Sequence, residues 1–121
     1  MLMLDTNAVI GYLGDDQALM DCIDTRGLDE DIALPTIVVV ELLGYPAITE
    51  AHTQEIEVFL QSASLFDLTP SLAREAAHIR RTYALATADA VIAATALQAH
   101  APLVTRDKKF TKIPTLICIV P

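Results

Sequence analysis

The chain begins with an apolar run that stops at three polar residues. The first four residues are apolar, and Asp5, Thr6 and Asn7 follow directly. Such a run is typical of a buried strand in a parallel sheet, and open α/β sheets place their chemistry beyond the carboxyl ends of their strands. One interpretation therefore puts Asp5 at a crevice. The other makes Thr6 or Asn7 the cap of a helix over residues 8–13 and leaves Asp5 as an exposed loop acid.

Hydrophobic periodicity divides the rest of the chain into short elements. Helices are predicted over residues 8–13, 15–27, 50–63, 69–83 and 87–97, and strands over 32–34, 66–68, 103–104 and 116–120. Gly14 is expected to end the first helix in a left-handed conformation, which a residue without a side chain adopts easily.

Residues 36–44 are ambiguous between strand and helix. Their β-branched side chains favour a strand, whereas the Pro35-Thr36 pair is typical of a helix start. In both cases Glu41 is a lone carboxylate in an apolar run. Burying a charge without a partner is costly, and a cation is one partner that would explain the acid.

The predicted helix over residues 87–97 carries an acid near its start. Thr87 is a plausible N-cap, and Asp89 lies in the first turn, where the helix dipole favours negative charge. That dipole effect alone would account for the residue. However, Asp89 shares a face with Ile92 and Ala93 by the three-and-four spacing, so it should point toward the packed side of the helix and into a cleft.

The opening pattern recurs near the end of the chain. A short apolar strand, Leu103 and Val104, stops at Thr105, Arg106 and Asp107. Asp107 is therefore a fourth acid at the end of an element or on an apolar helix face, after Asp5, Glu41 and Asp89.

Length and composition limit the class of protein. A chain of 121 residues suits one domain over residues 1–121. Hydrophobic residues make up 53% and mean hydropathy is +0.43, yet no apolar run approaches the ~18 residues of a membrane span. We expect a cytoplasmic protein without a membrane segment. Cys22 and Cys118 lack metal-ligand spacing, so we expect two buried thiols.

The net charge of −8 is distributed unevenly. Residues 1–73 hold thirteen acids and one base, whereas residues 74–121 hold three acids and seven bases. Most of the charged residues, the acids in particular, are expected simply to face solvent on the protein surface. The second segment could also face an anion, and Arg106, Lys108 and Lys109 lie beside a candidate acid.

If the four acids converge, their mutual repulsion raises their pKa values unless a cation neutralises them. Oxygen ligands select hard ions such as Mg²⁺ or Mn²⁺. One or two such ions can activate water and stabilise in-line displacement at a phosphodiester.

Four segments that contain these acids resemble, in order, the motifs of the PIN-domain ribonucleases, and most closely the VapC-type toxins of toxin-antitoxin pairs. They are Leu4-Asp5-Thr6-Asn7, Glu41-Leu42-Leu43-Gly44, Asp89 to Ala96, and Val104 to Phe110. Each motif is weak alone, but four in order in a chain of this size form a specific signal.

The resemblance implies a three-layer α/β/α domain with a central parallel sheet, and it places Glu41 on a helix. It also implies a Mg²⁺- or Mn²⁺-dependent endoribonuclease that acts on RNA, forms a homodimer and is inhibited by a cognate antitoxin. Asp5, Glu41, Asp89 and Asp107 would be catalytic and metal-binding. Thr6, Asn7 and Thr105 would support the site. Arg106, Lys108 and Lys109 flank the candidate acid Asp107, and we expect them to bind the RNA backbone, because RNA affinity depends largely on Lys and Arg.

Two alternatives use the same features differently. A receiver-type signalling domain is another α/β domain with a magnesium-binding acid cluster, but it would need adjacent acids after its first strand. A catalytically inactive PIN-fold binding module would share the architecture, although the four acids are retained here. His52, His78 and His100 occur in separate segments, and each is expected to be an ordinary helix-surface residue, so histidine-based cleavage is not favoured.

Overall fold

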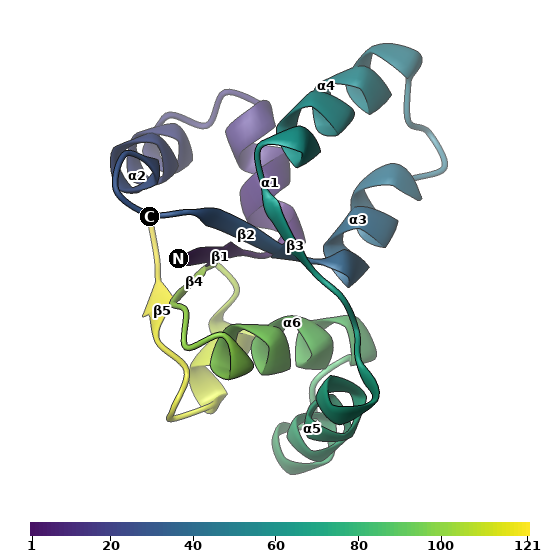
Figure 1. The fold of residues 1–121 in the computed structure, drawn as a ribbon, viewed down its shortest axis with the longest axis vertical. Helices are drawn as coiled ribbons and strands as arrows, with labels where there is room; N and C mark the ends of the chain where they lie inside the picture. The colour runs from purple at the N-terminus through teal and green to yellow at the C-terminus, as the bar shows by residue number, and fades with distance from the viewer.

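The computed structural model describes all residues, 1–121, as alternating strands and helices (Figure 1). In chain order the elements are β1 (Leu2–Leu4), α1 (Thr6–Leu13), α2 (Gln17–Gly27), β2 (Ile32–Pro35), α3 (Thr36–Leu43), α4 (Glu50–Gln61), β3 (Ser64–Phe66), α5 (Pro70–Tyr83), α6 (Thr87–Gln98), β4 (Leu103–Val104), the 3-10 helix η1 (Lys108–Lys112) and β5 (Cys118–Ile119).

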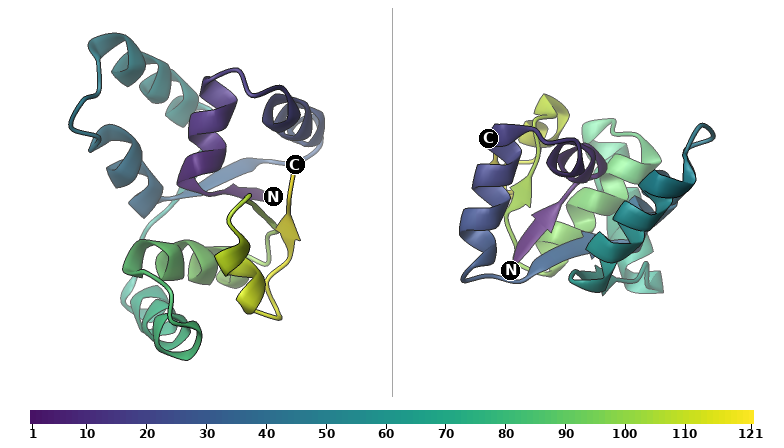
Figure 2. Two further views of the ribbon diagram at one scale, coloured as in Figure 1. Left: turned by 180° about the vertical axis from the view of Figure 1, so that it is seen from behind. Right: turned by 90° about the horizontal axis from the view of Figure 1, so that it is seen from above.

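The five strands form one parallel sheet in the order β3-β2-β1-β4-β5. The chain runs from β1 outward to β3 and then returns past β1 to β4. Helices α1, α2 and α4 therefore lie on one side of the sheet and α5 and α6 on the other (Figures 1 and 2). This arrangement confirms the expected α/β/α fold. In such sheets the direction of winding reverses between two strands, here β1 and β4, and ligands bind at that point.

The core lies between the sheet and the helices on each side. β1 is fully buried, as expected for an apolar strand covered on both faces. In α6, every residue from Ala90 to Ala96 is buried, and five of these seven are Ala or Thr. Small side chains let α6 pack closely against both the sheet and α5, and this packing fixes the direction of Asp89 in its first turn.

Tertiary packing resolves the ambiguity at residues 36–44 in favour of a helix. Pro35 ends β2 with an extended backbone and acts as the N-cap of α3, and Val38 and Leu42 are buried. Their spacing of four places both on one helical face. Burial of that face outweighs the strand propensity of the β-branched residues.

Several predicted boundaries were wrong. The strand expected at 66–68 lies at Ser64–Phe66, because Asp67 and Leu68 lead into the Thr69 cap of α5. The last strand spans only Cys118–Ile119. Ala86, not Thr87, is the N-cap of α6 and provides no side-chain hydrogen bond.

Two residue-level expectations also failed. Gly14 ends α1 with φ −89°, and the left-handed residue is the next one, Asp15, with φ 64°. Aspartate tolerates that conformation better than most residues. Cys22 and Cys118 are free thiols but only partly buried.

No helix is both long and apolar enough to cross a membrane.

Candidate functional site

Asp5 lies at the junction of β1 and α1 and is itself the N-cap of the helix. Its Oδ1 accepts a hydrogen bond from the Ala8 backbone N–H at 2.8 Å. The residue is buried, with 4% of its surface exposed. Neither Thr6 nor Asn7 is the cap, and the interpretation of Asp5 as an exposed loop acid is wrong. A carboxylate cap keeps spare lone pairs, because each oxygen accepts more than one bond.

Thr105 joins the end of β4 to the end of β1. Met3 pairs with Leu103 and Leu4 with Val104, so the residues that follow the two strands are neighbours. The Thr105 hydroxyl donates a hydrogen bond to Oδ2 of Asp5. The same hydroxyl accepts a bond from the Asp107 backbone N–H at 3.0 Å. Thr105 therefore fixes the Asp5 carboxylate and also holds the turn that carries Asp107.

Glu41 reaches the site from α3. Its Oε1 accepts a hydrogen bond from the Thr6 hydroxyl at 2.6 Å. Thr6 is the first residue of α1 and follows Asp5 in the chain, so this bond connects α3 to the start of α1. Asn7, by contrast, is exposed, and its side chain makes no hydrogen bond within the chain.

Burial and neighbouring acids raise the pKa of two carboxyl groups. Burial is the main cause for Asp5, with smaller contributions from the charges of Asp107 and Asp89, while hydrogen bonds from Thr105 and Ala8 act in the opposite direction. Burial also raises the pKa of Asp89, and the charges of Asp107 and Glu41 add to it. The nearby Lys109 ammonium lowers it. Asp5 and Asp89 are therefore each affected by the charges of two of the other acids predicted from the sequence.

The protein side chains alone do not provide a complete coordination shell for a metal ion. No group of three or more histidine, cysteine, aspartate or glutamate side chains is placed so that it could hold a metal by itself. The donors present are all carboxylate oxygens, and burial, together with the charges of neighbouring acids, raises the pKa of Asp5 and Asp89. Mg²⁺ retains several waters and uses one or two carboxylates, so these residues fit a hydrated hard cation.

Three basic residues adjoin Asp107, but they differ in availability. Arg106 forms a bidentate ion pair with Asp16, with Nη1–Oδ2 at 2.6 Å and Nη2–Oδ1 at 2.9 Å. Lys108 and Lys109 are exposed and begin η1. The two lysines are therefore unpaired, whereas the guanidinium of Arg106 is already engaged.

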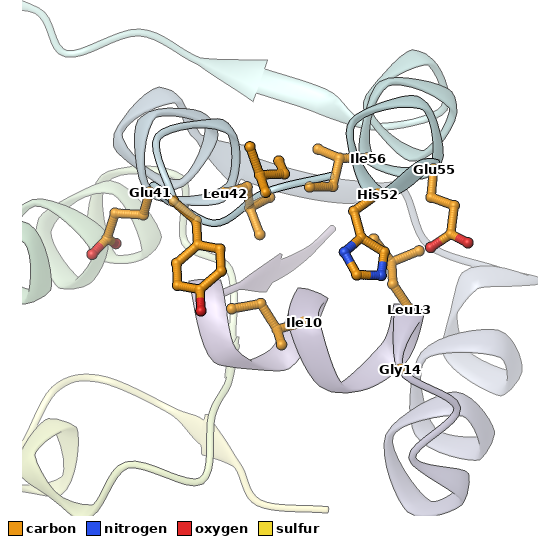
Figure 3. A pocket seen from close by; sticks show the side chains of 10 residues that line it. Ile10, Leu13, Gly14, Glu41, Leu42, His52, Glu55 and Ile56 are labelled. Atoms are coloured by element: carbon orange, nitrogen blue, oxygen red, sulfur yellow. The ribbon is translucent and has the colours of Figure 1, made fainter. Parts of the chain in front are cut away.

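The site continues into an apolar pocket between α1, α3 and α4, with a volume of about 530 Å³. Ile10 and Leu13 of α1 face Leu42 of α3 and Ile56 of α4 across it (Figure 3). Glu41 lies at one end, and His52 and Glu55 lie at the other.

Sequence reasoning missed two parts of this region. Asp16 was expected only as a helix start, and no local pattern indicates its partner, which lies 90 residues away in the chain. His52 was expected to be an ordinary helix-surface residue. It is exposed, but it also lines the pocket, which depends on how α4 packs beside α1.

Several solved structures have the same fold. VapBC2 from Rickettsia felis, in a structure with a DNA fragment from its promoter, is 22% identical and has a TM-score of 0.86 over 99% of this chain and 98% of that chain. A toxin-antitoxin complex from Klebsiella pneumoniae is 23% identical, with a TM-score of 0.84 over 97% and 96%. FitAcB from Neisseria gonorrhoeae is 25% identical, with a TM-score of 0.69 over 98% and 96%.

No curated protein sequence matches the chain. The family model described as "PIN domain", however, matches residues 2–116, which include all four acids and the turn around Thr105. The resemblance inferred from the four motifs is thus confirmed, and the receiver-type alternative is set aside. The chain belongs to the PIN-domain family, a family of nucleases.

Proposed function

We propose that this PIN domain is a metal-dependent endoribonuclease and the toxin component of a toxin-antitoxin pair. The observation that carries the proposal is the link through Thr105 between Asp5 and Asp107, which follow β1 and β4. Asp89 lies near enough to Asp5 and Asp107, and Glu41 near enough to Asp89, for their charges to affect the pKa values of Asp5 and Asp89. Family membership supports nuclease chemistry. The similarity to VapBC and FitAcB structures supports the toxin role.

Asp5 and Asp89 would hold a Mg²⁺ or Mn²⁺ ion, with Glu41 and Asp107 completing the shell through water. When bound, the ion activates water and stabilises the charge that develops at the phosphodiester. The protein's own part is to fix the acids. Thr105 and the Ala8 N–H orient Asp5, and Thr6 orients Glu41. Such supporting contacts matter, because loss of an outer-shell partner typically lowers metal affinity or activity by 10- to 100-fold.

RNA would approach from the side of the second segment of the chain. Phosphate binding depends mainly on Lys and Arg, and residues 1–73 contain only one base. Lys108 and Lys109 follow Asp107 directly and are exposed, and Lys109 lies near enough to Asp89 to lower its pKa. These two lysines would hold the RNA backbone near the acids, and Arg106 would join them only by leaving Asp16. RNA as substrate also implies action in the cytoplasm.

The antitoxin would occupy the pocket between α1, α3 and α4. This pocket is lined mainly by apolar residues and contains the acids Glu41 and Glu55. Its residues all belong to the segment 1–73, which holds thirteen of the sixteen acids of the chain. An apolar segment that also carries a basic side chain complements such a surface. Because Glu41 forms one end of the pocket, an occupant there would also obstruct the acids.

A homodimer is the assembly we propose. Large apolar side chains are exposed on the single chain, among them Ile117 at 69% and Val58 at 66%. A second copy would cover part of this apolar surface. Light scattering of the purified protein tests this proposal, and a monomer at all accessible concentrations would reject it.

The test of activity uses the purified protein and a panel of structured and unstructured RNAs. Each RNA is incubated with Mg²⁺, with Mn²⁺ and with a chelator. Cleavage in the presence of either metal, lost with chelator, is the expected result. Cleavage that survives chelation would reject the metal-dependent mechanism. Metal binding without cleavage of any RNA would favour the inactive binding module.

A further inference from the structure

The ion pair between Asp16 and Arg106 connects two segments that adjoin the site. Asp16 lies in the connection between α1 and α2 and is the N-cap of α2, where its Oδ1 accepts a bond from the Leu19 N–H at 3.3 Å. Arg106 lies between Thr105 and Asp107. The Asp16–Arg106 contact is the only ion pair in the structure that joins two side chains far apart in the sequence. The other two ion pairs join the N-terminal amine to Glu30, and Arg26 to Glu30 four residues later.

The pair closes a ring of contacts around Asp5. From Asp5, helix α1 leads along the chain to Asp16, whose carboxylate is bound to Arg106 by two hydrogen bonds. The neighbouring Thr105 then returns to Asp5 through its hydroxyl. Two consecutive residues of one turn therefore bind both ends of the segment that contains α1. Thr105 binds Asp5 at its start, and Arg106 binds Asp16 just after its end.

The guanidinium is held on a second side as well. Arg106 Nε donates to the backbone carbonyl of Pro121 at 3.3 Å, and the Thr105 N–H donates to the Ile119 carbonyl at 3.0 Å. The turn is therefore bonded to the α1–α2 connection, to β5 and to Pro121, which follows β5. A bidentate Arg–carboxylate pair fixes direction as well as distance, because two parallel hydrogen bonds orient the planar group.

We propose that Asp16 and Arg106 are positioning residues that hold the turn carrying Thr105 and Asp107 against Asp5, and that Arg106 acts through Asp16 rather than by gripping RNA. This inference rests on the proposed nuclease function. It also reassigns one of the three basic residues that the sequence suggested for RNA binding.

Two substitutions separate the positioning role from an RNA contact. Asp16→Ser removes the ion pair but keeps a good N-cap for α2. Arg106→Lys keeps the positive charge but loses the planar two-pronged donor. If Arg106 were a phosphate contact, Asp16→Ser would free it and Arg106→Lys would largely preserve it. Glu30→Gln is the matched control, since Glu30 is a partly exposed acid that pairs with Arg26 and the N-terminal amine near the amino ends of β1 and β2.

The first readout uses the metal-free protein and does not depend on activity. Because the Asp107 N–H donates to Thr105, its hydrogen exchange reports whether the turn is held in place. We expect faster exchange at Asp107 in both variants but not in Glu30→Gln. Mn²⁺ affinity, measured by calorimetry, should fall about 10-fold, the lower end of the range for supporting residues around a metal.

The second readout is cleavage kinetics. We expect kcat to fall in both variants while RNA affinity stays at the wild-type value. Tighter RNA binding or faster cleavage by Asp16→Ser would overturn the proposal, as would wild-type exchange and Mn²⁺ affinity in both variants. If the wild type cleaves no RNA, the proposed function fails, and exchange and metal affinity still decide the positioning role.

Discussion

The Thr105 hydroxyl donates a hydrogen bond to Oδ2 of Asp5, although the two residues are 100 positions apart in the chain. The bond exists because β1 and β4 are neighbours in the sheet, so their carboxyl ends meet. Both residues are buried, with 1% and 4% of their surfaces exposed. A buried carboxylate depends on its donors, and Thr105 is one of the two that Asp5 has.

Thr105→Val tests this dependence. Valine keeps the shape but removes the hydroxyl, so Asp5 loses a donor and the Asp107 N–H loses an acceptor. A hydrogen bond to a charged group contributes roughly 1.5–3 kcal/mol, and we expect the free energy of unfolding at pH 7 to fall by about that amount. Thr95→Val is the control, because Thr95 is equally buried but donates only within its own helix, to Val91. Equal losses in the two variants would contradict the account.

The pKa of Asp89, raised above its ordinary value of 3.8, predicts how stability varies with pH. The folded state binds this proton more tightly than the unfolded state does. The contribution of Asp89 to stability is therefore greatest below about pH 3.8 and decreases as the pH rises toward the folded-state pKa. Without metal, Asp89→Asn should have a higher melting temperature than wild type at pH 7.

That advantage should shrink as the pH is lowered through the same window, because wild type then becomes neutral at this position too. Thermal melts from pH 3 to 8 in chelator check the prediction. Asp67→Asn serves as a control at an exposed acid remote from the cluster. If Asp89→Asn is less stable than wild type at neutral pH, or if the difference in stability does not depend on pH, then folding does not raise the pKa of Asp89.

Divalent metal should stabilise the wild type through the same acids. A ligand that binds only the folded state stabilises it by about 2.7 kcal/mol at one hundred times its Kd. We expect Mg²⁺ or Mn²⁺ to raise the melting temperature of wild type clearly more than that of Asp5→Asn. Asparagine can still accept from the Ala8 N–H, so the variant should fold. Equal shifts in the two proteins would mean that Asp5 is not part of a shared metal site.

Replacing Lys108 and Lys109 by alanine should weaken RNA binding and flatten its salt dependence. Each phosphate contact with single-stranded RNA contributes about 0.7 to the slope of log affinity against log salt, so the slope should decrease by up to ~1.4. Metal affinity should stay near the wild-type value. Arg26→Ala, which removes a base in the last turn of α2 before β2, is the control. Wild-type affinity across a salt series would exclude these lysines from the RNA path.

The sequence predicted those features of the fold that depend on local pattern. The apolar run ending at Asp5 and the Thr69-Pro70 helix start agree with the structure. The helix containing Asp89 is also present, but it is buried on all sides from Ala90 to Ala96 and not on one face as predicted. The order of the four motifs also predicted that Glu41 and Asp107 belong to the same site as Asp5 and Asp89. What made these features predictable is that burial imposes a period on the residues themselves.

Features that depend on contacts between distant residues could not be predicted. The β-branched side chains of residues 37–40 left α3 ambiguous, because its outcome depends on what Val38 and Leu42 pack against. The pairing of Asp16 with Arg106 joins a partly exposed aspartate to an exposed arginine, and neither has a local signature. Likewise, the shift of β3 to Ser64–Phe66 reflects its pairing with Ala33–Pro35 in the assembled sheet.

The most direct test of the central claim is RNA cleavage by wild type and Asp5→Asn over a Mg²⁺ titration. Asparagine preserves the shape and the N-cap while removing one charge. Because loss of a mere supporting residue costs 10- to 100-fold, loss of a principal ligand should lower the rate by more than about 100-fold, with the folded state retained by circular dichroism. Cleavage by Asp5→Asn at the wild-type rate and the same Mg²⁺ dependence would contradict the account.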